Sequence, residues 1–182
     1  MDRKKTKLPH GKYDPDLLIR MFRKAAALRN EMVAAGFTDN GGAIHCAERI
    51  LDILGQRLNY PGLSHGNALK YYKDAEFSDA AWELHQRKRP VLVEHVSPRR
   101  HLTQMAIAKI ETASDDQFRV FVKRHYKTVL LSPDETRHLN RLNRSTVCSS
   151  RLSEAGIKVA VRQATTNVTS VAYSLLHSSF PT

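Results

Sequence analysis

The sequence predicts an α+β fold that is mainly helical, in which a helical N-terminal half precedes a small unit of strand, helices, strand and helix. Three observations lead to this prediction. Apolar residues recur at helical spacing over residues 15–58. Two short apolar runs follow, at residues 90–96 and 127–131. A Ser-Pro pair stands directly after each run, which is typical of a strand that passes into a helix.

The N-terminal half divides into a basic flexible tail over residues 1–12 and a helical region over residues 13–89. Asp14 and Pro15 form a favourable helix start, and Gly36 ends that helix. A second helix extends to a turn at residues 59–62. Residues 64–73 predict a short helix, and Ser78 is expected to cap another that runs to the basic residues before Pro90.

The second half is predicted to hold a compact core over residues 90–145 and a C-terminal extension over residues 146–182. After the first strand, residues 98–113 predict a helix, and Ser114 opens a capping box for the next one. Ser132 begins a second capping box after the strand at residues 127–131. Residues 156–163 alternate like a strand, and residues 168–176 fit a strand or a helix.

The charge balance indicates the kind of partner. Lys and Arg number 29 against 18 Asp and Glu, which gives a formal net charge of +11. Such an excess favours nucleic acid over an acidic protein or a membrane surface. No apolar run approaches the length of a membrane span, and the two cysteines form no CxxC pair. We therefore expect a cytoplasmic protein without a membrane partner.

The most informative motif is the pair Glu94 and His95 at the end of the first strand. A carboxylate beside an imidazole can hold a divalent metal and deprotonate water, and phosphodiester hydrolysis needs both. The second strand leads through Ser132 and Pro133 into a polar helix. If the two strands pair, we expect the Glu94–His95 end to lie near the start of this helix.

These segments resemble the HNH, or ββα-metal, nucleases over residues 88–145, with an insertion of two helices between the strands. The resemblance implies that His95 is the general base and Glu94 the first metal ligand. It implies a second ligand from the helix, His138 or Asn140, of which we favour His138. The implied cofactor is a divalent metal, Mg²⁺ or Mn²⁺ ahead of Zn²⁺, with Arg99 stabilising charge electrostatically.

The predicted function is therefore a metal-dependent endonuclease that acts on DNA in preference to RNA. The helical half would bind the substrate, form a homodimer or receive a protein partner. The nucleic-acid backbone is expected to contact basic residues on both sides of the motif, namely Arg87, Lys88, Arg89, Arg100, Arg137, Arg141 and Arg144.

The alternative is a non-catalytic nucleic-acid-binding or assembly protein of the phage or mobile-element type. In that case His95 makes a structural hydrogen bond at a strand end, and Glu94 pairs with a nearby arginine. Asp134 and Glu135 are then residues favoured by the helix dipole at its start, and His138 is a surface helix residue.

Overall fold

The computed structural model describes residues 13–143 and 151–162. It is an α+β fold dominated by helices, with one four-stranded mixed sheet, which confirms the predicted class. In chain order its elements are α1 (Pro15–Ala34), α2 (His45–Asn59), the 3-10 helix η1 (Gly66–Tyr71), β1 (Glu76–Ser78), α3 (Asp79–Gln86), β2 (Leu92–His95), α4 (Arg99–Ile110), α5 (Asp115–His125), β3 (Thr128–Leu131), α6 (Pro133–Asn143), α7 (Arg151–Glu154) and β4 (Val159–Val161).

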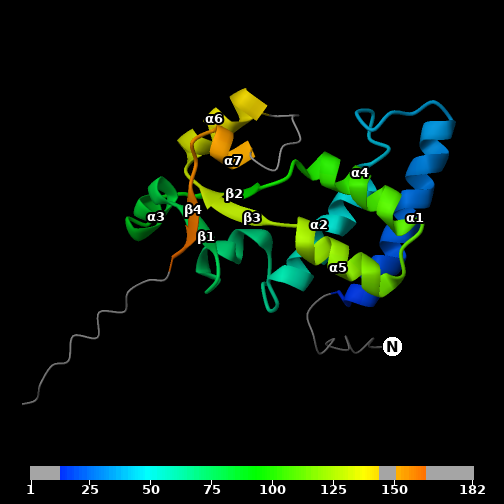
Figure 1. The fold of residues 1–182 in the computed structure, drawn as a ribbon, viewed down its shortest axis with the longest axis horizontal. Helices are drawn as coiled ribbons and strands as arrows, with labels where there is room; N and C mark the ends of the chain where they lie inside the picture. Colours follow the sequence, from blue (N-terminus) through cyan, green and yellow to red (C-terminus); the bar gives the residue numbers. More distant parts are fainter. Residues whose placement is uncertain (1–12, 144–150, 163–182) are drawn as a thin grey trace, which may run out of the picture.

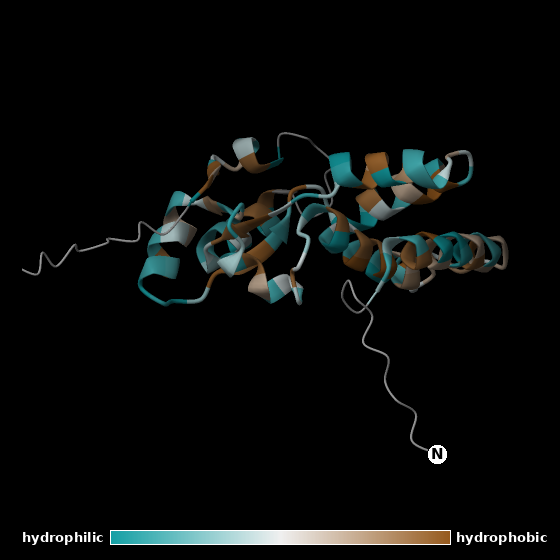
Figure 2. Cartoon of the chain, turned by 90° about the horizontal axis from the view of Figure 1, so that it is seen from below, coloured by the Kyte–Doolittle hydropathy of each residue, from teal (hydrophilic) through white to brown (hydrophobic). Residues whose placement is uncertain are grey.

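Four helices, α1, α2, α4 and α5, pack together on one side of the molecule, and the sheet with α3, α6 and α7 lies on the other (Figure 1). Hydrophobic and hydrophilic residues alternate around the four helices (Figure 2), as expected where each buries one face. Phe22 of α1 stacks on Phe118 of α5 in the shared core, with ring centroids 5.2 Å apart. Asp14 caps α1 as predicted, because its side chain accepts from the Asp16 backbone N–H.

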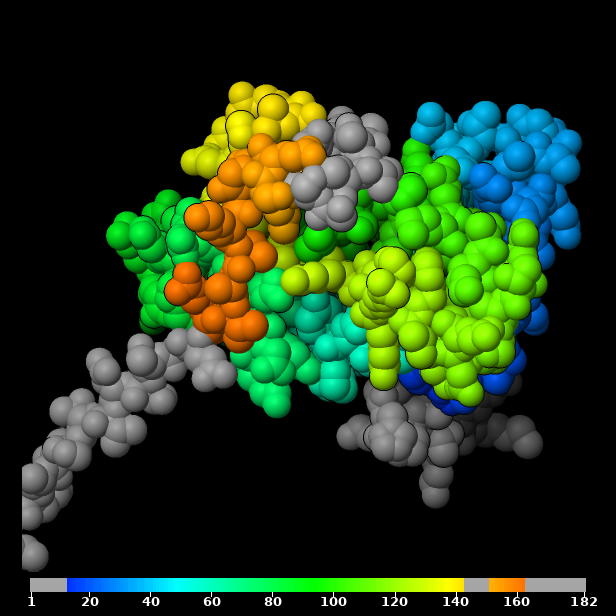
Figure 3. Space-filling view, in the orientation of Figure 1, coloured from blue at the N-terminus to red at the C-terminus, as the bar shows by residue number. Residues whose placement is uncertain are grey.

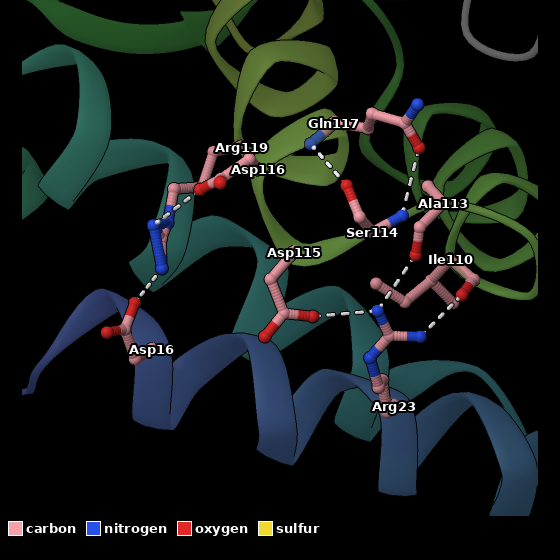
Figure 4. Close-up of polar contacts among 9 residues, drawn as sticks. All are labelled: Asp16, Arg23, Ile110, Ala113, Ser114, Asp115, Asp116, Gln117 and Arg119. Carbon is pink, nitrogen blue, oxygen red and sulfur yellow. Dashed lines mark hydrogen bonds and ion pairs between the residues drawn. The ribbon is translucent and has the colours of Figure 1, made fainter.

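Arg23 joins α1 to the connection between α4 and α5 (Figure 4). Its guanidinium donates to the carbonyl oxygens of Ile110 and Ala113, at 2.7 and 2.9 Å, and to Asp115 at 2.7 Å. It thus satisfies carbonyl groups that the end of α4 leaves without helical partners. The predicted capping box at Ser114 opens α5 at the same place.

The sheet has the strand order β2-β3-β1-β4, with β1 parallel to β3 and the other pairs antiparallel. All four residues of β3 are buried, because helices cover both faces of this strand. Leu130 packs on Phe77 in a core beneath η1 and α3, whereas Val129 and Leu131 pack on Leu139 of α6. The alternation of side chains along a strand explains why this run is apolar throughout.

The hypothesis that the two strands pair is confirmed, because β2 and β3 are antiparallel neighbours. The expected consequence was wrong, however. His95 lies opposite Thr128 at the beginning of β3, and Leu92 lies opposite Leu131. The start of α6 is therefore next to the Leu92 end of β2, and the Glu94–His95 end meets a later part of that helix.

One strand was missed. Glu76–Ser78 forms β1 within the region predicted to be helical, and it pairs with β3 and β4. The sheet therefore joins the predicted helical region, residues 13–89, to the predicted core that begins at residue 90. The short helix expected at residues 64–73 is the 3-10 helix η1, and the strand expected at residues 156–163 is β4.

Several predictions concern residues outside the described ranges, among them the basic tail at residues 1–12 and the element at residues 168–176. Across residues 13–143 and 151–162, every helix is too short or too polar to cross a membrane.

Candidate functional site

A cleft of about 890 Å³ opens where the helical group meets the sheet. In the space-filling view, α4 and α5 lie on one side of this meeting and α6 and α7 on the other (Figure 3). Five elements line the cleft, namely α2, β2, the first part of α4, α6 and α7. The lining residues are His45, Glu48, Arg49, Val93, Glu94, His95, Pro98, Arg99, Arg100, His101, Gln104, Asn140 and Arg151.

Helix and strand geometry explains why Asn140 reaches Glu94 and His95. From Leu92 to His95 the strand advances about 10 Å, at roughly 3.3 Å per residue. From Pro133 to Asn140 the helix advances about 10 Å as well, at 1.5 Å per residue. Because α6 starts beside Leu92 and contacts β2, its Asn140 arrives at the Glu94–His95 end of the strand.

His95 is held by a buried carboxylate that lies far from it in the sequence. Its Nε2 is 3.4 Å from Oδ1 of Asp52, whose side chain is only 9% exposed. The Tyr126 hydroxyl donates to the same oxygen at 2.6 Å, and the Tyr126 ring packs edge-on against the imidazole. The other imidazole nitrogen of His95, Nδ1, is buried and hydrogen-bonds to none of the described residues.

The Asp52 carboxylate is stabilised in its charged form. Burial by itself would raise its pKa, but the interactions with His95 and Tyr126 outweigh burial and hold the pKa below the usual value for aspartate. Burial and the nearby Asp52 charge raise the pKa of Tyr126, so this phenol remains a hydrogen-bond donor. Asp52 is therefore a negative charge next to the imidazole at neutral pH.

Glu94 has the opposite character. Burial raises the pKa of this carboxyl group, and the positive charges of Arg151 and His95 offset only part of the effect. Arg151 is itself buried and links two elements of the cleft, because it donates to the His95 carbonyl oxygen at 3.0 Å and to the Asn140 amide oxygen at 3.4 Å. The cleft thus contains a carboxylate that a further cation would stabilise.

Arginines surround these groups. Arg99 and Arg100 begin α4 and line the cleft. Arg100 lies 3.4 Å from the buried carboxylate of Glu48, whereas Arg99 is exposed. Arg49 contributes a third cation from α2, 3.2 Å from Asp52. The cleft therefore offers positive charge on the side opposite α6.

The structure separates the two candidate ligands on α6. Asn140 lines the cleft, whereas His138 is exposed and lies outside its lining. Side chains two positions apart on an α-helix are rotated by about 200° around its axis. His138 and Asn140 therefore cannot both face the same cleft. Of the two predicted ligands, Asn140 is therefore the one that the structure places with Glu94 and His95.

The two acids at the start of α6 have structural partners. Glu135 accepts from the Ser132 backbone N–H at 2.8 Å and from the Ser78 hydroxyl at 2.6 Å, which confirms the predicted capping box. Asp134 pairs with Arg137, which is exposed.

The other predicted basic residues that the structure describes lie outside the cleft lining. Arg141 is exposed on α6, and Arg144 lies outside the described residues. Arg87 is 3.8 Å from Glu83 on α3. Lys88 and Arg89 line a second hollow near the start of β2.

Glu94 and Asn140 are the oxygen donors of the cleft that could hold a hydrated hard cation, because Mg²⁺ binds through one or two carboxylates and keeps several waters. Zinc needs three or four nitrogen, sulfur or carboxylate ligands. Within residues 13–143 and 151–162, no group of three or more His, Cys, Asp and Glu side chains is arranged to hold a metal ion.

Sequence reasoning missed Asp52, Glu48, Tyr126 and Arg151. A signal for two of them existed, because Glu48 and Asp52 are one helical turn apart and share the buried face of α2 with Leu51. Acidic residues on an apolar helix face are unusual unless they have partners. No local feature of Tyr126 or Arg151 indicates that either belongs to the cleft.

Comparisons with protein-family models, curated proteins and solved structures give no match for this chain.

Proposed function

We propose that this protein is a metal-dependent endonuclease that hydrolyses phosphodiester bonds of nucleic acid in the cleft between the helical group and the sheet. One observation carries the proposal. Glu94 and His95 from β2 and Asn140 from α6 line the same basic cleft. The order β2, β3 and α6 supports a likeness to the ββα-metal nucleases, with α4 and α5 inserted between the paired strands.

In the proposed reaction His95 is the general base. Asp52 occupies the Nε2 side of the imidazole, so the nitrogen that accepts the proton would be Nδ1. Because Nδ1 is buried, the proposed step requires the attacking water to enter the space beside it. The negative charge of Asp52 stabilises the imidazolium that this transfer creates. Tyr126 fixes the carboxylate in turn, since its hydroxyl donates to the oxygen that faces the imidazole.

Glu94 and Asn140 would hold the metal ion, which supplies charge stabilisation for the phosphoryl group and the leaving oxygen. Arg99 and Arg100 lie on the opposite wall and would orient the phosphate. These residues would act on the charge of the phosphate and not on the proton of the attacking water. Their substitution should therefore affect cleavage differently from substitution of His95.

The second candidate function is nucleic-acid binding without cleavage. It is favoured by the net charge of +11 and by the basic residues that lie outside the cleft, including Arg137 and Arg141. Binding of this kind weakens steeply with salt and needs no divalent ion.

The decisive experiment measures nicking of supercoiled plasmid and cleavage of labelled RNA with Mg²⁺, Mn²⁺ or EDTA. We expect metal-dependent cleavage by the wild type that His95→Ala reduces at least about 100-fold, the usual contribution of a general base. His138→Ala is the matched control, because it removes an imidazole outside the cleft. Cleavage retained by His95→Ala, or salt-sensitive binding with no cleavage by the wild type, would overturn the proposal.

A further inference from the structure

A second hollow of about 390 Å³ lies between η1 and the start of β2. Three cations line it, Lys70 from η1 and the consecutive residues Lys88 and Arg89. Among the described residues, no acid is part of this lining and none forms an ion pair with any of the three cations. Like charges that converge without a counter-charge create a site for an anion.

The second hollow and the cleft share one lining residue, Val93. Among the described strands, β2 lies at the edge of the sheet, next to β3. The hollow is lined by Leu92 at one end of β2, and the cleft is lined by His95 at the other. About 10 Å of extended strand separates these two residues. A flexible phosphate chain in the cleft could therefore follow the edge of β2 into the hollow.

An exposed aromatic side chain, Tyr71, lies outside the lining of the hollow but next to one of its cations, Lys70. Tyr71 is 74% exposed, an unusual state for a large ring, and the Lys70 ammonium nitrogen lies 5.1 Å from its centroid. The Tyr71 ring also approaches His85, with centroids 5.9 Å apart. Burial and, to a smaller extent, the charge of Lys70 lower the pKa of His85.

We propose that this hollow binds a segment of single-stranded nucleic acid that extends from the cleft, with Lys70, Lys88 and Arg89 contacting phosphates and Tyr71 stacking on a base. The inference deepens the proposed function and rests on it for the identity of the polymer. A base is free to stack on a side chain only when its strand is unpaired, which is why a single strand is preferred to a duplex. An exposed ring beside converging cations matches this ligand better than it matches an acidic peptide.

The test measures binding by fluorescence polarisation in a His95→Ala background, so that cleavage does not interfere. The probes are fluorescent oligothymidylates, one short enough to fill only the cleft and one long enough to reach the hollow. We expect Lys70→Gln/Arg89→Gln to weaken binding of the long probe about tenfold. Its salt slope should fall by about 1.4, the contribution of two phosphate contacts on a single strand. Binding of the short probe should not change.

The matched control is Lys24→Gln/Lys123→Gln, which removes the same charge from exposed positions on α1 and α5 outside both hollows. Tyr71→Ala should weaken binding of the long probe about fivefold or more, and Tyr71→Phe should restore it, because stacking needs only the ring. Equal losses in the control pair would overturn the site, as would a duplex or a polyglutamate peptide that binds the hollow more tightly than the long probe.

The two proposals fail in different ways. Wild-type protein that binds the long probe through the hollow but cleaves nothing contradicts the nuclease function and leaves the binding site intact. Cleavage by the wild type together with unchanged binding of the long probe by Lys70→Gln/Arg89→Gln contradicts the binding site alone.

Discussion

At the scale of single residues, the site depends on two carboxyl groups with opposite environments. Asp52 is buried among hydrogen-bond donors, and its pKa is lowered despite burial. Glu94 is half-buried beside fewer compensating groups, and burial raises its pKa. This difference separates their roles, because one carboxylate is satisfied within the protein and the other gains from a bound cation.

Asp52→Asn should leave the fold intact and reduce cleavage on the order of 100-fold, because the amide no longer fixes the imidazole or stabilises its charged form. Nitrogen-15 NMR of the His95 ring should show the Nε2-protonated tautomer in the wild type and a mixture in the variant. Asp134→Asn, an exposed acid, serves as the control. An unchanged ring spectrum together with full activity would contradict a positioning role for Asp52.

Glu94→Gln should stabilise the protein at neutral pH. A raised pKa means that the folded state prefers the protonated carboxyl group of Glu94. The stability that this preference contributes is fully present below the unfolded pKa of about 4.3, and it is lost as the pH rises through the pKa of the folded state. Urea unfolding should therefore give similar midpoints for variant and wild type near pH 4 and a higher midpoint for the variant at pH 7.

The same variant tests the metal site without an activity assay. Mg²⁺ should raise the melting temperature of the wild type at pH 7, because a ligand that binds only the folded state stabilises it. Glu94→Gln should lose this increase, and Glu31→Gln, an exposed control on α1, should keep it. An equal response of all three proteins to Mg²⁺ would argue against Glu94 as a ligand.

At the scale of elements, α2 positions the proposed general base, His95, through Asp52. It carries Asp52 and, one turn later, Gly55, against which the Tyr126 ring packs. Further contacts fix the end of α5 to the same helix, since Asn59 donates to the Tyr126 carbonyl at 2.7 Å. The close approach of α2 to Tyr126 is therefore what places the phenol on Asp52.

Gly55→Ala should destabilise the protein by about 1–3 kcal/mol, although alanine favours a helix by about 1 kcal/mol. A Cβ at this position would lie 2.2 Å from the Tyr126 ring, so the ring must move away from Asp52. Urea unfolding measures the change. In a Tyr126→Ala background the same substitution should cost far less, and Gly66→Ala, which meets only the movable end of Gln56, should have little effect.

At the scale of the whole molecule, the positive charge is not spread evenly over the functional surface. The cleft and the second hollow share the lining residue Val93, and their cations come from α2, α4, α7, η1 and the segment before β2. Acids that line the cleft, Glu48 and Glu94, are buried or half-buried. The surface presented to a polyanion in these hollows is therefore predominantly basic.

Binding of single-stranded DNA to the cleft should follow from this charge. If Arg49, Arg99 and Arg100 each contact a phosphate, the logarithm of the binding constant for a short oligonucleotide should fall against the logarithm of salt concentration with a slope of about −2. Arg99→Gln should reduce the slope by about 0.7, and Lys24→Gln on α1 should leave it unchanged. A salt-independent binding constant would contradict electrostatic recognition in the cleft.

The sequence by itself determined the features that depend on local interactions. The starts of α1, α5 and α6 were predictable because capping residues act within one helical turn, as Asp14, Ser114 and Ser132 do. β3 was predictable from its apolar run, and the pair Glu94 and His95 stood out because polar residues end an otherwise apolar strand.

Only the tertiary structure decided which distant residues complete the site. β1 has three residues and forms because β3 and β4 supply its hydrogen-bonding partners. The antiparallel register of β2 and the length of α6 bring Asn140 to the cleft, and the rotation of the helix keeps His138 out of it. Asp52 meets His95 through the packing of α2 against the end of β2. Contacts between residues far apart in the chain arise from packing, which local sequence patterns do not encode.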